Sequence, residues 1–152
     1  PFRSVLLHAL VVDENGEKRI DLKPTVILDC GHTGICSLEI HEGKVIAQNH
    51  HSWAPIYCAI AKQIKLETGI EIEHDQIKEE LRIQKMSEQF KAAVQSEKIL
   101  LQRFLPSPTI ITGGNGEAIH SIFPNAIVLP ITSCATGYFK ISQRTARKLP
   151  QV

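Results

Sequence analysis

Thr25-Val-Ile-Leu-Asp29-Cys-Gly31-His-Thr33-Gly34 carries an apolar strand straight into an acidic residue and a glycine turn, here called the first turn (residues 29–34). Further along, Thr109-Ile-Ile-Thr112-Gly113-Gly114-Asn115-Gly116-Glu117 carries a second apolar strand into the second turn (residues 113–117). Glycine lets backbone N–H groups approach a phosphate, and a nearby carboxylate can face the metal ion of that phosphate. A strand followed by glycines and a helix can lie flat against a sugar or a base. Together the two turns predict a nucleotide site.

Both turns resemble motifs of the actin-like ATPase superfamily, in particular its ParM-like or StbA-like plasmid-segregation branch. The second phosphate motif of that family, roughly Asp-x-Gly-x-x-Thr-x-Asp at the start of a β-hairpin, is similar to residues 29–36. The adenosine motif, an apolar strand followed by Thr/Ser-Gly-Gly and a helix, is similar to residues 110–114. Residues 123–130 and 135–139 look like the last strand and helix of this domain. The resemblance covers residues 25–139.

The resemblance implies a ribonuclease-H-like α/β domain of the actin type, with a mixed sheet flanked by helices. It also implies ATP or ADP as ligand, together with Mg²⁺. Asp29 is the expected catalytic residue and would hold Mg²⁺ through water, although an aspartate here can also simply form the turn. The expected nucleotide-binding residues are Gly31, His32, Thr33 and Gly34, then Lys78, Glu79 and Arg82, then Gly113, Gly114, Asn115, Gly116 and Glu117.

A predicted helix supplies the middle group of these residues. Ile77-Lys78-Glu79-Glu80-Leu81 is similar to an Ile-Lys-Glu-Lys-Leu stretch of actin, whose lysine and glutamate approach the adenine and ribose. A lysine stem can cover a base, and a carboxylate can accept hydrogen bonds from ribose hydroxyls. Lys-Glu pairs on an exposed helix face also serve helix stability and solubility alone. Both interpretations stay open for Lys78 and Glu79.

Two positions beside the first turn depart from the family pattern. Gly34 stands where the family has the hydroxyl of a threonine, and Cys36 stands where many members have a second acidic residue. Magnesium handling and hydrolysis depend on such groups, whereas phosphate binding by hairpin amides does not. Two functions therefore stay open: an ATPase domain, and a non-hydrolysing interaction module with the same fold.

Actin-type ATPases hold nucleotide between two related domains, and the Asp-x-Gly turn of their first domain is missing from this sequence. We therefore expect a single second domain at residues 1–143 with a disordered tail at 144–152, or one half of a split protein. Hydrolysis would require the missing first actin-like domain as partner. The resemblance further implies a homo-oligomer or filament and a DNA-bound adaptor protein, as in plasmid or DNA segregation. Cell-division, pilus-assembly and small-molecule kinase branches share the same motifs.

Composition limits the other function classes. A chain of 152 residues with 43% hydrophobic content suits one well-packed domain. A formal net charge of +1 gives no basic footprint for direct nucleic-acid binding. No apolar run approaches the roughly 20 residues of a spanning helix, and the first residues lack a signal-peptide pattern. Four cysteines without a Cys-x-x-Cys pair favour free thiols. We expect a cytoplasmic protein without membrane association.

Hydrophobic periodicity predicts strands first and helices in the middle of the chain. Strands are expected at residues 3–12, 25–28, 35–40, 45–48 and 126–129, with an Asn-Gly turn at 13–16. Ser52 is expected to cap a helix that Gly69 ends, and Asp75 is expected to cap a second helix. A third helix is expected at about residues 87–104, before Pro106.

Overall fold

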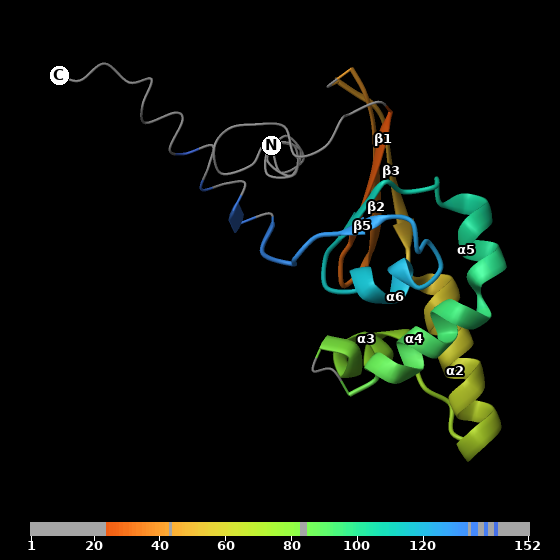
Figure 1. Ribbon diagram of the computed structural model, residues 1–152. Helices are drawn as coiled ribbons and strands as arrows, with labels where there is room; N and C mark the ends of the chain where they lie inside the picture. The colour runs from red at the N-terminus through yellow and green to blue at the C-terminus, as the bar shows by residue number, and fades with distance from the viewer. Residues whose placement is uncertain are drawn as a thin grey trace.

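A five-stranded mixed sheet organises the computed structural model, which describes residues 24–42, 44–82 and 85–133 and positions 135, 136, 139 and 142 (Figure 1). The strands are β1 (Thr25–Cys30), β2 (Gly34–His41), β3 (Lys44–Ser52), β4 (Ile110–Thr112) and β5 (Ile127–Val128), in the order β3-β2-β1-β4-β5. β2 is antiparallel to both β1 and β3, and β4 is parallel to both β1 and β5. The expected mixed sheet flanked by helices is confirmed. The expected strand at 3–12, the turn at 13–16 and the tail at 144–152 lie outside the described residues.

β1 lies at the centre of the sheet because its side chains are apolar on both faces. Leu28 and Cys30 belong to the main core, whereas Ile27 packs with Leu38 and Ile110 on the opposite face. All five of these side chains are buried. The end of β1, which carries the first turn, is therefore fixed from both sides of the sheet.

The helices gather mainly at one end of the sheet, as Figure 1 shows for α2, α3 and α4 beside α6. Their bounds are α2 (Ala54–Thr68), α3 (His74–Arg82), α4 (Ser87–Ser96), α5 (Lys98–Phe104) and α6 (Gly116–His120). α2 buries Ile56 and Ile60 one turn apart, and each such burial contributes roughly 1.5–3 kcal/mol. Gly69 ends α2 in the left-handed conformation, as expected. Within the described residues, no helix is both long enough and apolar enough to cross a bilayer.

Two of the expected helix starts are wrong by one or two residues. The N-cap of α2 is Trp53, while Ser52 is the last residue of β3 and its hydroxyl accepts a hydrogen bond from the Ala54 N–H at 3.1 Å. Pro at the start of α2 favours the helix there because its fixed φ suits the first turn and needs no donor. Asp75 lies inside the first turn of α3, which begins at His74.

The expected third helix is two helices, α4 and α5, which meet at Glu97. The Ser96 hydroxyl donates to the Ala93 carbonyl oxygen at 2.9 Å, which competes with the backbone ladder at this point. Phe90, Val94 and Leu101 are nevertheless buried in the main core, as the spacing predicts.

Candidate functional site

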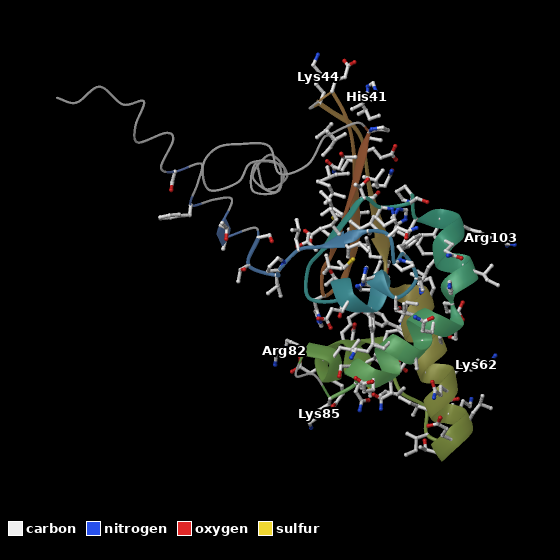
Figure 2. All side chains as sticks on the ribbon, viewed as in Figure 1. His41, Lys44, Lys62, Arg82, Lys85 and Arg103 are labelled. Atoms are coloured by element: carbon white, nitrogen blue, oxygen red, sulfur yellow. The ribbon has the colours of Figure 1, made fainter. Side chains whose placement is uncertain are left out.

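A cleft of about 670 Å³ opens where β1 and β4 end. The two turns, the facing ends of α3 and α4, the start of α6 and one later residue line it. These residues are Asp29, Gly31, His32, Gly113, Gly114, Asn115, Glu117, Ala118, Leu81, Arg82, Ser87, Phe90, Lys91 and Ile131. Figure 2 shows Arg82 at the end of α3, with His41 and Lys44 at the opposite end of the sheet.

The two turns contact each other directly. The Asn115 backbone N–H donates to the Cys30 carbonyl oxygen at 3.1 Å, and the Asn115 side-chain amide donates to the Gly31 carbonyl oxygen at 3.0 Å. The register that pairs Asp29 with Thr112 in the parallel strands brings both turns to the same edge of the sheet. The two glycine turns therefore lie side by side, as a shared nucleotide site requires.

Gly113 permits this contact. Its φ is +95°, a conformation that favours glycine, and a Cβ there would lie 2.7 Å from the carbonyl carbon of Cys30 and 2.8 Å from its nitrogen. Any other residue would therefore push the second turn away from the end of β1. Gly114 has room for a side chain, because a Cβ there would meet only the Ile131 side chain, at an ordinary contact distance of 3.5 Å.

Two consecutive carbonyl oxygens of the first turn, those of Gly31 and His32, accept hydrogen bonds from buried aromatic side chains. Trp53 Nε1 donates to the Gly31 oxygen at 2.9 Å, and the Tyr57 hydroxyl donates to the His32 oxygen at 2.9 Å. The Gly31 N–H closes the turn by donating to the Gly34 oxygen at 2.9 Å. Among the described residues, no hydrogen bond uses the N–H groups of His32 and Thr33. The turn therefore offers donors for an anion.

Asp29 lies near the end of β1, between Cys36 of β2 and Thr112 of β4, and lines the cleft. Burial raises the pKa of its carboxyl, because the protein takes water away from the charged form. Burial also raises the pKa of the neighbouring Cys30 thiol, which stays protonated inside the core. Asp29 is thus a half-buried carboxylate at the mouth of the first turn.

Several expected site residues do not line the cleft. Gly34 is buried in β2, where a Cβ would overlap the His51 carbonyl oxygen and lie 2.9 Å from His50 Nε2, so its glycine serves the packing of β3. Gly116 is buried, and a Cβ there would lie 3.3 Å from Ile111, so it serves the packing of α6 on β4. Thr33 is exposed and also lies outside the lining.

The expected residues of α3 form ion pairs with each other and with their neighbours. Lys78 Nζ lies 2.7 Å from Asp75 Oδ1, and Arg82 makes two hydrogen bonds to Glu79 at 2.6 and 2.9 Å. The hydrogen bonds and the charge of Arg82 lower the pKa of the Glu79 carboxyl. Arg82 lines the cleft, whereas Lys78 and Glu79 do not.

Sequence reasoning missed the contribution of α4 and of the aromatic residues behind the first turn. Phe90 lines the cleft and packs edge to face on Trp53, with ring centroids 5.1 Å apart. Lys91 pairs with Glu88 at 2.9 Å, and this hydrogen bond, with a smaller contribution from Glu117, raises the pKa of Lys91. The spacing of these residues marks a helix face but not its partner, so no local signal identifies them as site residues.

The donor set at the cleft fits a weakly held, largely hydrated magnesium ion. Among the residues that the structure describes, no three His, Cys, Asp or Glu side chains are arranged to hold a metal ion. Mg²⁺ keeps several waters and is commonly bound by one or two carboxylates together with phosphate oxygens of the substrate. Asp29 alone meets that requirement at the first turn.

Comparison with solved structures shows the actin-like ATPase fold. The chain matches the apo structure of the psk41 ParM protein with a TM-score of 0.62 and 14% identity, over 97% of this chain and 49% of that one. It matches Ta0583, an archaeal actin homolog, with a TM-score of 0.50 and 16% identity, over 93% of this chain and 53% of that one. The chain thus spans about half the length of these structures. No protein-family model and no curated protein matches the sequence.

Proposed function

We propose that this chain is the nucleotide-binding second domain of an actin-like, filament-forming ATPase of the ParM/StbA-like plasmid-segregation branch. The observation that carries the proposal is the cleft at which two glycine turns, far apart in sequence, meet beside a half-buried carboxylate. The motifs of both turns and the likeness to an archaeal actin homolog and a ParM protein support it. The domain would occupy residues 1–143, followed by the tail at 144–152.

The ligand we propose is ATP or ADP with Mg²⁺. The N–H groups of His32, which lines the cleft, and of Thr33, the exposed residue that follows it, would bind phosphate oxygens. Asp29 would hold the metal ion through water. Mg²⁺, when bound, would neutralise phosphate charge. Arg82 and Lys91, each paired with a glutamate of its own helix, also line the cleft wall. Gly114 would let the sugar or base approach the backbone closely.

This chain would supply one wall of a two-walled site. It spans about half of the matched structures, which supports a first actin-like domain as the partner that completes the cleft. Hydrolysis would then depend on both domains, and the whole protein would form a homo-oligomer or filament that works with a DNA-bound adaptor. We expect the isolated domain to bind ADP with a dissociation constant of about 0.1 mM or weaker, since each ~1.4 kcal/mol of lost contact costs tenfold in affinity.

Gly34 favours a second candidate, a nucleotide-binding interaction module that does not hydrolyse ATP. The family places a threonine hydroxyl at this position. Here the backbone of β3 leaves no room for a side chain, because a Cβ would overlap the His51 carbonyl oxygen. The missing hydroxyl therefore cannot be restored by a simple substitution, and binding without turnover follows if no other group replaces it.

Calorimetric titration with Mg-ADP tests the binding site. Gly114→Ala should weaken ADP binding at least about tenfold, because its methyl group enters the cleft, while the free energy of unfolding changes by less than about 0.5 kcal/mol. Gly69→Ala is the control for binding, since Gly69 ends α2 and does not line the cleft; it should leave ADP affinity unchanged although its left-handed backbone makes the variant less stable. Absence of ADP binding at millimolar concentration would contradict the proposed site. Submicromolar binding would contradict the half-site argument.

A further inference from the structure

Two aromatic side chains at the start of α2 hold the first turn from behind. Trp53 and Tyr57 are 1% and 2% exposed, and they lie four residues apart on one face of the helix. Each donates one hydrogen bond at 2.9 Å, Trp53 to the Gly31 oxygen and Tyr57 to the His32 oxygen. Two consecutive carbonyl groups of the turn are therefore tied to the helix.

The two hydrogen bonds from Trp53 and Tyr57 also set the direction of the N–H groups of His32 and Thr33. In a trans peptide the carbonyl oxygen and the N–H of the following residue point in opposite directions. The Gly31 carbonyl faces Trp53, so the His32 N–H points away from that side chain. The His32 carbonyl faces Tyr57, so the Thr33 N–H points away as well. Neither N–H has a hydrogen-bond partner among the described residues.

We propose that Trp53 and Tyr57 are positioning residues that hold the His32 and Thr33 N–H groups ready for the phosphate groups of the ligand. The inference rests on the proposed nucleotide site and names the part of the ligand that these two residues govern. Without the Tyr57 hydroxyl, the peptide that joins His32 to Thr33 loses the donor that fixes its orientation. The bound anion would then have to order this peptide itself, which lowers affinity.

The Tyr57 hydroxyl is a protonated donor at neutral pH, and burial raises its pKa further, to about 12. Neither tying side chain carries a charge. Trp53 and Tyr57 therefore act on the shape of the turn and leave its charge unchanged. This separates their role from that of Arg82 and Lys91, which are charged and line the cleft wall.

The test is an NMR titration of the ¹⁵N-labelled chain with inorganic pyrophosphate, Mg-ADP and adenosine, in wild type and Tyr57→Phe. In wild type, pyrophosphate and ADP should shift the His32 and Thr33 amide signals, whereas adenosine should leave them in place. Tyr57→Phe should weaken pyrophosphate and ADP binding about three- to tenfold and leave adenosine binding unchanged, since one neutral hydrogen bond is removed. Trp53 is the only tryptophan of the chain, so its fluorescence reports independently on the turn.

Thr68→Val is the matched control. It removes a hydroxyl from the other end of α2, where Thr68 donates to the Ile64 oxygen at 2.8 Å, far along the helix from the first turn. Equal weakening of pyrophosphate binding by Thr68→Val and Tyr57→Phe would show a general effect of helix stability and overturn the positioning role. Equal loss of adenosine and pyrophosphate affinity in Tyr57→Phe would also overturn it. If wild type binds none of the three ligands, the nucleotide site itself is refuted, and the positioning role falls with it.

Discussion

Gly113→Ala tests the contact between the two turns on which the site depends. The left-handed backbone costs a non-glycine residue about 1–2 kcal/mol. The new Cβ would also lie 2.7 Å from the Cys30 carbonyl carbon, and relieving such an overlap costs about 1–3 kcal/mol. The sum is a loss of about 2–5 kcal/mol, a large part of the 5–15 kcal/mol that stabilises a typical domain.

Urea unfolding followed by circular dichroism measures this loss. With a slope of about 2 kcal/mol/M, the midpoint should fall by about 1–2.5 M. Gly69→Ala is the control, because its φ is +74° but nothing lies within 4 Å of the added methyl group. That variant should lose only the backbone contribution of about 1–2 kcal/mol. If Gly113→Ala costs no more than Gly69→Ala, the close approach of the second turn to Cys30 is wrong.

Two further predictions concern Asp29. Burial raises its pKa above the ordinary value of 3.8, so its protonated form adds stability that is complete below pH 3.8 and is lost as the pH rises through the raised pKa. Asp29→Asn should therefore be more stable than wild type at pH 7, with the gain shrinking towards pH 3.8 in urea titrations; a gain independent of pH would contradict the buried carboxylate. In the full-length protein that carries this domain, Asp29→Ala should lower the rate of phosphate release at least about tenfold, with little effect on folding. Equal release by both proteins would favour the non-hydrolysing module.

Much of the fold could be predicted from the residues alone. A continuous apolar run at 25–28 indicates a strand buried on both faces, and β1 is the central strand. The four-residue spacing of Ile56 and Ile60 and the stop at Gly69 predict α2 closely. The split between α4 and α5 was missed, because it depends on a local hydrogen bond of Ser96 within an unbroken hydrophobic pattern.

Only those site residues that stand at the end of a predicted strand could be predicted from the sequence. Asp29, Gly31, Gly113 and Gly114 stand at strand ends, so their place at one edge of a sheet follows from the strand pattern, and all four line the cleft. Gly34 and Gly116 look the same in sequence, yet the backbone of β3 leaves no space for a side chain at Gly34, and a Cβ at Gly116 would press against Ile111 at 3.3 Å. Sequence cannot separate these two reasons for a glycine.

The sequence by itself determined the apolar strand at 25–28, the two glycine turns and the helix that Gly69 ends, because these features depend on backbone preferences and on the period of apolar residues. Only the tertiary structure decided what surrounds the turns. Trp53 meets Gly31 across 22 residues and Asn115 meets Gly31 across 84, and no local preference encodes a contact over such a separation. The cleft is therefore a product of packing: the sheet aligns two strand ends, and the core that buries Trp53, Tyr57 and Phe90 sets the positions of the groups that face the ligand.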